Sequence, residues 1–572
     1  MTGKITIPFF LIYLGCCLLN CNSLKAQSTR QGKKLIHLGW ELTSPQIVKA
    51  NYVKMEATSP FDGITFILRD TLEDGSVLTE GSIFTKKLIN RKDLEKSIND
   101  IKNCRFTQFK SNFIRANTVP DNLKWSDDVA WEVATKNMAT MAWFAKQAGL
   151  VGICYDPESY GEHQFKWNRN DGKSFEETKT LAKERGKAMM TEIGKVYPNI
   201  VFWGLFLLSF ERAAFNADEE DVALMTDTYG LYPSFVDGLL EAVPASAKMV
   251  EGNEDAYYSR DKENLLSIYN DSKVGLTKFL STANQQKFKS HVSVGLGLYT
   301  DMYTNDFGRK YYFAPTPNRT RLERFRERIH EAMEITDEYV WLYNEEYKWW
   351  NIPFAEERFD KHFSEPLIND KLPGILESAL FAKAPIKFLE SQLSTVKYGS
   401  DNLVSNGDFE QNSKPATEIL DWTNKDCPPG YLQWRPDKSN FAITVQKNEG
   451  VNGTACAKMI GGNSILIKQV AVKPSETYFI SAESRMTGGQ MLMSTRFMNE
   501  SFSNFIDWGL NKSFSFSERG NSKWCRASGL IKIPAEVFYL QLLIIPVSEH
   551  PDDIIYIDNI LAYQLQSLFK FN

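Results

Sequence analysis

The sequence Leu150-Val-Gly-Ile-Cys-Tyr-Asp-Pro-Glu-Ser-Tyr-Gly-Glu162 decides how the rest of the chain is interpreted. Its apolar run, residues 151–155, has the length and the residue types of a buried strand. Side chains alternate along a strand, so Cys154, Asp156 and Glu158 would share one face. Two carboxylates at the carboxyl end of a buried strand are costly to place there, which favours a catalytic role. The alternative is that Asp156 caps a turn and Glu158 is solvated.

Seven further stretches have the same strand character, and helical patterns separate them along the chain. Together with the first stretch they predict eight strand–helix units, and therefore an α/β fold with a (β/α)₈ TIM-type barrel over residues 33–393. A doubly wound open sheet competes, but the G-x-G-x-x-G turn typical of it does not follow the first strand. The seven stretches are residues 35–41, 63–70, 113–117, 200–211, 248–254, 291–299 and 339–345.

Acidic residues end several of these strands. In a barrel the carboxyl ends of the strands form one rim, where active sites are built. We expect Glu158 to act as a general acid, and Asp156 to hold its orientation and keep it protonated through a like charge. Glu254 and Glu345 are the candidates for the second catalytic carboxylate, and Glu41 is a candidate for binding hydroxyl groups.

Aromatic residues lie near the same strand ends. A ring offers an apolar face to a sugar, so rings beside carboxylates favour a sugar-binding cleft, whereas a solvated rim and core packing are the simpler interpretations. His163, in the loop after the fourth strand, suits this chemistry better than His37, which is more typical of a barrel core. The predicted substrate-binding residues are Trp40, Glu41, Tyr155, His163, Trp203, Tyr299, Trp341 and Tyr343.

The composition excludes several classes of protein. With 572 residues, 43% of them hydrophobic, the chain can build more than one core. Its formal net charge of -5 gives no reason to expect nucleic acid or an anionic membrane surface as a partner. The cysteines lack C-x-x-C spacing, the six histidines are not clustered, and no G-x-S-x-G turn is present. These absences argue against a zinc site, a metal hydrolase and a serine hydrolase.

The first 26 residues are interpreted as a signal peptide. Lys4 supplies a positive charge, and the apolar residues 5–19 are too few to span a bilayer well. Leu14-Gly15-Cys16 resembles a lipoprotein cleavage box, whereas Leu24-Lys25-Ala26 suits ordinary signal peptidase. Both interpretations predict export, to the periplasm, the outer membrane or the medium, and no transmembrane span in the mature chain.

The pattern changes after the barrel. Residues 394–401 are interpreted as a polar linker, and residues 402–572 contain short β runs with Gly and Asn turns but no helical periodicity. This pattern predicts an all-β sandwich domain.

Three segments of this second domain resemble the CenC-like carbohydrate-binding modules, which are jelly-roll sandwiches. The segments are N-L-V-S-N-G-D-F-E at 402–410, K-P-S-E-T-Y at 473–478 and Y-I-D-N-I at 556–560. Such modules often hold a structural calcium, and the resemblance implies that Glu410 and Asp558 could supply its carboxylates. Trp422, Tyr431 and Trp434 are candidates for a sugar-stacking surface or for core packing.

The barrel resembles glycoside hydrolases. Gly152-Ile-Cys-Tyr-Asp-Pro-Glu158 is similar to the second half of the D-x-D-x-E motif of chitinase-like barrels, which places the acid on the final Glu. Cys154 replaces the first of these aspartates, which argues against substrate-assisted chemistry on N-acetylglucosamine. A group of retaining barrels carries glutamates on strands four and seven, but strand seven here ends Gly297-Leu-Tyr-Thr-Asp301 without Glu.

These observations predict a glycoside hydrolase that cleaves a polysaccharide or oligosaccharide, with an appended glycan-binding module. One carboxylic acid would protonate the leaving oxygen and one carboxylate would attack or activate water, so catalysis would need no cofactor. Two alternatives remain open. One is a non-catalytic glycan-binding protein on a barrel that has lost its chemistry. The other is a polysaccharide lyase, which would need a Tyr or His base and a partner for a uronic acid such as Arg115.

Overall fold

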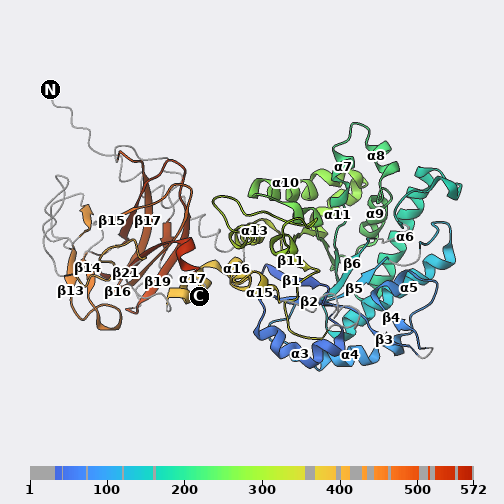
Figure 1. Ribbon diagram of the computed structural model, residues 1–572, viewed down its shortest axis with the longest axis horizontal. Helices are drawn as coiled ribbons and strands as arrows, with labels where there is room; N and C mark the ends of the chain where they lie inside the picture. The colour runs from blue at the N-terminus through green and yellow to red at the C-terminus, as the bar shows by residue number, and fades with distance from the viewer. Residues whose placement is uncertain are drawn as a thin grey trace. The chain divides into compact units, whose positions relative to one another are not determined.

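The computed structural model divides into two compact units, Gly32–Lys383 and Ala384–Asn572 (Figure 1). The predicted signal peptide lies outside the residues that the structure describes. Among the described helices, none is both long and apolar enough to cross a membrane. The described residues are 32–41, 43–72, 75–118, 122–158, 163–353, 367–393, 401–411, 428, 430–434, 443–460, 465–501, 513–515, 522–547, 550 and 552–569.

The first unit is a barrel of parallel strands, in the order β10-β11-β1-β2-β5-β6-β7-β8-β9. The two ends of this order, β9 and β10, are consecutive in the chain and separated only by Gly295. One continuous segment therefore pairs with β8 on one side and with β11 on the other, and it closes eight strand positions into a barrel. The predicted (β/α)₈ architecture is confirmed. The strands are β1 (Lys34–Gly39), β2 (Gly63–Phe66), β5 (Phe113–Asn117), β6 (Gly152–Asp156), β7 (Val201–Gly204), β8 (Lys248–Glu251), β9 (Val292–Val294), β10 (Leu296–Tyr299) and β11 (Tyr339–Asn344).

Large side chains fill the interior of the barrel. The ring centroids of Phe113 and Trp203 lie 5.1 Å apart, and those of Trp203 and Trp341 lie 5.6 Å apart. Where β6 meets β7 the backbones approach so closely that a Cβ on Gly152 would lie 1.8 Å from the carbonyl oxygen of Val201. Only glycine fits there, so the packing of β6 against β7 requires the glycine at the start of β6.

Helices surround the strands (Figure 1). Ser174 and Glu177 form a capping box at the start of α6, the helix that follows the deciding stretch. The helices of this unit are α3 (Pro45–Ala57), α4 (Glu95–Lys102), α5 (Asp128–Ala148), α6 (Phe175–Val196), α7 (Arg212–Phe215), α8 (Glu220–Thr226), α9 (Tyr232–Ala242), α10 (Lys262–Lys273), α11 (Thr282–His291), α12 (Asp301–Thr304), α13 (Arg321–Ile335), α15 (Ile368–Lys371) and α16 (Ile375–Lys383). Its 3₁₀ helices are η2 (Glu80–Phe84), η3 (Arg91–Leu94), η4 (Arg169–Asp171), η5 (Ser209–Glu211), η6 (Glu254–Tyr258) and η7 (Gly275–Phe279), and a short hairpin pairs β3 (Asp70–Thr71) with β4 (Val77–Leu78).

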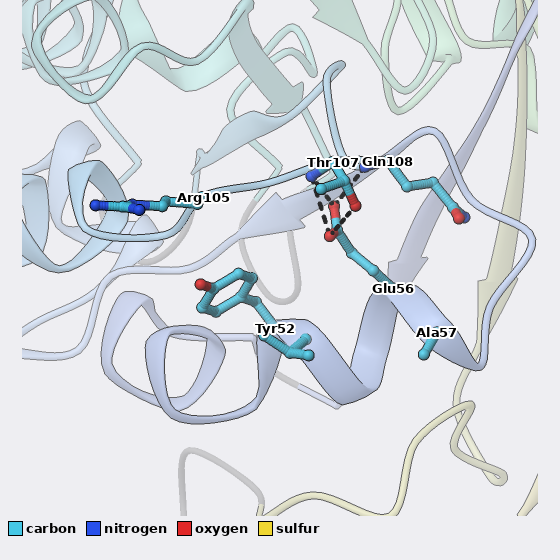
Figure 2. Close-up of a pocket in the computed structure, with 7 residues that line it drawn as sticks. Tyr52, Glu56, Ala57, Arg105, Thr107 and Gln108 are labelled. Atoms are coloured by element: carbon cyan, nitrogen blue, oxygen red, sulfur yellow. Dashed lines mark hydrogen bonds between the residues drawn. The ribbon is translucent and has the colours of Figure 1, made fainter.

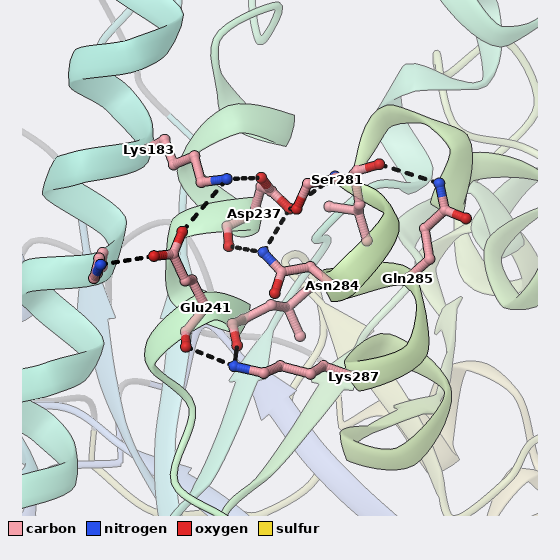
Figure 3. Close-up of polar contacts among 10 residues, drawn as sticks. Lys183, Asp237, Glu241, Ser281, Asn284, Gln285 and Lys287 are labelled. Atoms are coloured by element: carbon pink, nitrogen blue, oxygen red, sulfur yellow. Dashed lines mark hydrogen bonds and ion pairs between the residues drawn. The ribbon is translucent and has the colours of Figure 1, made fainter.

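A buried aspartate joins three of the outer helices (Figure 3). The carboxylate of Asp237 on α9 accepts hydrogen bonds from the Ser281 hydroxyl at 2.9 Å and the Asn284 amide at 2.8 Å, and it pairs with Lys183 Nζ at 2.6 Å. Burial raises the pKa of Asp237, but these donors outweigh burial and leave the pKa below its usual value. The network therefore stabilises the packing of α6, α9 and the start of α11.

The second unit is a β-sandwich, as predicted. Its two antiparallel five-stranded sheets have the orders β12-β15-β20-β17-β18 and β13-β14-β21-β16-β19. Apolar residues such as Leu466, Ile480 and Ile557 form its core. The strands are β12 (Leu432–Trp434), β13 (Ile443–Gln446), β14 (Cys456–Ile460), β15 (Ile465–Ala471), β16 (Thr477–Met486), β17 (Gln490–Met498), β18 (Ser513–Ser515), β19 (Cys525–Lys532), β20 (Tyr539–Val547) and β21 (Ile554–Gln564), with 3₁₀ helices η8 (Val451–Gly453) and η10 (Leu565–Leu568).

Helix α17 (Pro385–Leu393) belongs to this second unit. Its Glu390 accepts a hydrogen bond from the Ser528 hydroxyl at 2.7 Å, and Phe388 stacks on Phe569 with centroids 5.6 Å apart. The sequence alone placed this segment with the barrel, since its helical pattern continues that of α16. Apart from residue 401, the expected linker lies outside the described residues.

Candidate functional site

Three acidic side chains gather at the carboxyl ends of the barrel strands. Asp156 ends β6, Glu158 follows it, and Glu254 begins η6 directly after β8. Asp156 is held by the Asn117 amide, which donates to Oδ2 at 2.9 Å, and by the backbone N–H of Glu158, which donates to Oδ1 at 2.9 Å. Asp156 thus orients the backbone of Glu158, whereas the sequence predicted that it would hold the side chain.

Glu254 has the most perturbed environment of the three. Burial raises the pKa of its carboxyl group, and the like charges of Asp156 and Glu158 raise it further. A hydrogen bond from the Tyr257 hydroxyl, 3.4 Å from Oε1, opposes these effects only in part, and the pKa stays well above its usual value. Glu254 therefore keeps its proton to a higher pH than an exposed glutamic acid does, as a general acid requires.

The residue directly before Glu254 has a strained backbone conformation. Asn253 has φ of 61°, in the left-handed region, and is fully buried. Its side-chain amide donates to the Ser272 hydroxyl at 2.8 Å on α10. A non-glycine residue in this conformation is sparsely populated and persists where the surrounding structure holds it. Here the conformation sets the turn that carries Glu254.

Glu345 lies at the end of a hydrogen-bond relay. Trp40 Nε1 donates to the Tyr343 hydroxyl at 2.6 Å, and that hydroxyl donates to Glu345 Oε1 at 2.7 Å. Indole is only a donor, so the tyrosine proton must point to Glu345. Buried Asp301 holds the backbone, because its Oδ2 accepts the N–H groups of Glu345 and Glu346 at 3.0 and 2.8 Å.

Two stacked tyrosines connect the acid pair Glu254 and Glu345. The rings of Tyr257 and Tyr343 are nearly parallel, at 9° and 5.8 Å, and each hydroxyl hydrogen bonds one of these glutamates. Tyr299 lies 5.1 Å from Tyr343 and is only 3% exposed, so it supports that ring from beneath. Of the predicted sugar-binding residues, Trp40 and Tyr343 are the partly exposed rings of this relay. The sequence missed Tyr257, whose only signal is its place three residues after a strand-end acid.

Three predicted sugar-binding aromatics do not reach the cleft. Tyr155 is fully buried and points to the helix side of the sheet, where it packs on Phe84 at 6.2 Å and Phe202 at 5.5 Å. The assignment of Tyr155 is therefore corrected to core packing, as strand alternation with Asp156 requires. Trp203 and Trp341 are also corrected, since they are at most 1% exposed and fill the barrel interior.

Glu41 is corrected from substrate binding to a structural role. It is 1% exposed, and its carboxylate contacts His37 Nε2 at 3.0 Å, the Asn344 amide at 3.0 Å and the Trp349 N–H at 2.6 Å. Burial raises the pKa of Glu41, but the charge of His37 and these hydrogen bonds outweigh it and leave the pKa lowered. The partners are internal, so nothing in this arrangement presents Glu41 to a ligand.

Two further residues named from the sequence have other contacts. His163 is partly exposed, and its ring centroid lies 6.4 Å from that of Tyr229. Arg115 donates to the Thr65 hydroxyl at 3.0 Å and to the Gly39 carbonyl at 2.6 Å inside the barrel. These contacts engage the guanidinium group within the barrel, which does not favour the uronate partner of a lyase.

Glu211 is a buried acid of a different kind. It follows β7 in η5 and is 1% exposed, and neither of its carboxyl oxygens has a hydrogen-bond partner among the described residues. Burial raises its pKa to about 8, with a smaller contribution from the charge of Asp227. Nearby Glu251 is also buried, but its carboxylate accepts the N–H groups of Leu207 and Leu208 and anchors the loop after β7.

The residues of the predicted calcium site contact one loop of the sandwich. Asp558 accepts the Val451 N–H at 2.8 Å and the Thr454 hydroxyl at 3.1 Å, and Glu410 accepts the Ala455 N–H at 2.6 Å. Burial raises the pKa of Asp558 to about 6.

Oxygen atoms also converge beside this loop. A Cβ built on Gly450 would lie within 2.7 Å of oxygens of Ala455, Thr454 and Asp558. Oxygen donors of this kind fit a hard cation. In the described part of the chain, however, no three His, Cys, Asp or Glu side chains are grouped to hold a metal.

The predicted aromatic surface of the sandwich is described only in part. Tyr431 is 2% exposed and stacks on Phe409 at 5.2 Å, so it belongs to the core. Trp422 and the side chain of Trp434 lie outside the described residues.

A pocket of about 390 Å³ lies at the amino ends of the strands, away from the acids (Figure 2). The Glu56 carboxylate in this pocket accepts the N–H groups of Thr107 and Gln108 at 2.9 and 2.7 Å. Barrel active sites lie at the carboxyl ends, and this carboxylate is engaged, so we assign the pocket to structure. It is lined by Tyr52, Val53, Glu56, Ala57, Arg105, Thr107 and Gln108.

Comparison with known proteins adds structural neighbours only. No family model matches the chain, and no curated protein matches it. Similar solved structures include the enzymatically active domain of bacteriophage CBA120 tailspike protein 4, with 12% identity over 29% of this chain and 21% of that chain, at a TM-score of 0.22. Another holds CBM22-1 and GH10 modules of a Clostridium thermocellum endo-1,4-β-D-xylanase complexed with xylohexaose, with 17% identity over 24% of this chain and 26% of that chain, at a TM-score of 0.20.

A third similar structure is TmCBM61 in complex with β-1,4-galactotriose, with 14% identity over 29% of this chain and 99% of that chain, at a TM-score of 0.21. The neighbours are thus carbohydrate-binding modules and glycoside hydrolase or tailspike domains. The chain covers about a fifth of the first structure and about a quarter of the second.

Proposed function

We propose that the barrel is a glycoside hydrolase in which Glu254 is the general acid. The observation that carries this proposal is the raised pKa of Glu254, a half-buried residue at the strand ends beside Asp156 and Glu158. Such an acid can protonate the leaving oxygen of a glycosidic bond near neutral pH. The proposal moves the acid from Glu158, the sequence-based candidate, to the glutamate whose environment best retains a proton.

Glu345 is the proposed second carboxylate. The relay through Trp40 and Tyr343 directs a hydroxyl donor at Glu345 Oε1 and so orients the carboxyl group that would attack the sugar or activate water. The two glutamates thus have opposite environments, one among acids and one facing a donor. Opposite environments of this kind are how a pair of carboxyl groups divides acid and base roles.

Trp40 and Tyr343 are the proposed surface for the reacting sugar. Both rings are partly exposed and joined by a hydrogen bond of 2.6 Å, and Tyr257 and Tyr299 pack behind Tyr343. An aromatic face that neighbouring rings hold in place offers an apolar platform at little cost in side-chain entropy.

The remaining parts of the proposed function concern the sandwich and the destination of the chain. We propose that the sandwich binds glycan and that Glu410 and Asp558, with oxygens of the 450–455 loop, hold a structural calcium. The resemblance to CenC-like modules and the oxygen atoms around Gly450 support this. The apolar leader supports export of the protein.

The test compares Glu254→Gln with Glu158→Gln as a matched variant. Wild type and both variants are incubated with a polysaccharide panel, and new reducing ends are measured. We expect Glu254→Gln to lower kcat about 10²- to 10⁴-fold, because glutamine cannot donate the proton, and Glu158→Gln to lower it less.

A second substrate separates acid catalysis from general damage to the site. The dinitrophenolate group of a dinitrophenyl glycoside leaves without being protonated. Glu254→Gln should therefore retain far more of the wild-type rate on this substrate than on polysaccharide. Full polysaccharide activity in Glu254→Gln would contradict the assignment. A wild type that binds glycan without cleaving it would favour the non-catalytic glycan-binding protein.

A further inference from the structure

Two aromatic side chains of the barrel are well exposed to solvent, and both follow strands that end near the acids. Tyr258 is 54% exposed and ends η6, the short helix that Glu254 begins. Phe307 is 90% exposed and follows α12, directly after β10. No other aromatic side chain in the described part of Gly32–Lys383 reaches such exposure. Among the described residues of the barrel, the rings that are exposed to this extent therefore follow β8 and β10.

The Tyr258 side chain lies beside Tyr311. Burial raises the pKa of Tyr258 to about 12, and the neighbouring Tyr311 side chain adds to the rise. The Tyr311 ring packs against Tyr299 at 5.2 Å and 62°, and Lys310 Nζ lies 4.9 Å from the Tyr311 ring centre. An exposed ring with packed rings beside it loses less conformational freedom when a ligand stacks on it than an isolated ring does.

The same contacts connect Tyr258 with the proposed catalytic site. Buried Tyr299 lies beneath both Tyr311, at 5.2 Å, and Tyr343, at 5.1 Å. Tyr343 in turn donates its hydrogen bond to Glu345. The rings of Tyr343, Tyr311 and Tyr258 therefore form a strip with exposed surface that begins at Glu345. The buried ring of Tyr299 packs against the first two of them. A sugar chain bound at Glu254 and Glu345 would meet this strip on the side of β8 and β10.

We propose that Tyr258, supported by Tyr311, is an accessory subsite that stacks a sugar unit of a glycan chain whose cleavage point lies at Glu254 and Glu345. This inference rests on the proposed glycoside hydrolase function and adds a substrate class to it. The substrate is a chain of several sugars, and a glycoside of one sugar lacks the unit that reaches Tyr258.

The experiment measures kcat/KM against chain length in the full-length protein. The probes are β-1,4-linked oligosaccharides of xylose, glucose and galactose with two to six units, and nitrophenyl glycosides of the same sugars. We expect Tyr258→Ala to lower kcat/KM about tenfold on the longest cleaved chain, about 1.4 kcal/mol, and less than about twofold on the shortest. Tyr258→Trp should retain the length dependence, and Val53→Ala, an exposed apolar residue of α3, is the control.

An equal effect of Tyr258→Ala on all lengths, or no effect, would overturn the subsite. If wild type cleaves none of the probes, the hydrolase proposal fails on them, and calorimetry then tests the subsite alone. About tenfold weaker hexaose binding in Tyr258→Ala would support it. Unchanged binding, or no binding of any hexaose by wild type, would overturn it.

Discussion

Glu41 and Glu254 occupy equivalent places, each just beyond the carboxyl end of a barrel strand, but their surroundings are opposite. Glu41 follows β1 and contacts His37, Asn344 and the Trp349 N–H, and its pKa is lowered. Glu254 follows β8 among other acids, and its pKa is raised. Both lie at the rim where sequence places an active site. The partners around a carboxyl group therefore decide whether it stabilises the fold or can transfer a proton.

Glu211 extends this comparison to an acid with neither kind of partner. It is as buried as Glu41, but the structure describes no donor to its oxygens. Its pKa of about 8 follows from burial alone to a first approximation. Such a group stays mostly protonated in the folded protein at neutral pH, whereas the unfolded chain ionises it near its ordinary pKa.

The largest expected effect is the loss of stability in Glu41→Gln. Removing the carboxylate of the buried Glu41–His37 pair leaves buried donors without their charged acceptor, so we expect the free energy of unfolding to fall by about 3–5 kcal/mol. Because the folded pKa of Glu41 is lowered, its contribution is present above pH 4.5 and disappears as the pH falls through the folded pKa. Calorimetry of the barrel transition measures the change. Glu254→Gln is the matched variant and should cost less than about 1 kcal/mol, and equal losses would contradict the comparison.

Glu211→Gln should change how barrel stability depends on pH. The folded pKa is raised to about 8, so the folded state keeps a proton that the unfolded chain releases near pH 4.5. Wild-type stability then falls between these values, by about 2.3 kcal/mol from pH 6 to pH 8. Glutamine mimics the protonated acid and removes this fall, and thermal unfolding at pH 6 and pH 8 measures it. A parallel decline in both proteins would show that Glu211 is not the titrating group.

Asp156→Asn should shift the alkaline limb of the pH profile of kcat/KM. Glu254 must be protonated to act, so activity falls as the pH rises through its raised pKa. Removing the charge of Asp156 lowers that pKa, and we expect the limb to move toward lower pH by about one unit, or about 1.4 kcal/mol. The pH profile of kcat/KM measures the shift, and Asp128→Asn, an exposed residue at the start of α5, is the control. If the alkaline limb stays in place or moves to higher pH, the charge of Asp156 does not raise the pKa of Glu254.

The smallest expected effect concerns Asp558, an acid with raised pKa in the sandwich. Its folded pKa is about 6, so without metal its contribution to stability declines as the pH rises from 3.8 toward 6. Calcium replaces the proton, and millimolar calcium should stabilise the sandwich by about 1 kcal/mol at pH 7 and by less at pH 5. Calorimetry with calcium or chelator measures this. The same calcium effect in Asp558→Asn would place the ion elsewhere.

Local patterns were enough to predict the barrel and the sandwich. The strand stretches and the helices between them are short-range features, and parallel strands bring their ends to one rim whatever fills it. Alternation along β6 also placed Asp156 correctly on the inner face. The same rule puts Tyr155 on the helix side, so its assignment to the cleft conflicted with a pattern already visible in the sequence.

The sequence by itself determined the two architectures and the set of acids at the strand ends, because those depend on spacing within single segments. Only the tertiary structure decided which acid is protonated, which is engaged by donors and which rings are exposed. The pKa of Glu254 depends on Asp156 and Glu158, which a different strand brings beside it. Glu41 is stabilised by Asn344 and Trp349, which are about 300 residues away in the chain but are brought beside β1 by the pairing of β1 with β11. Burial and charge are properties of neighbours in space, and no pattern along the chain reports them.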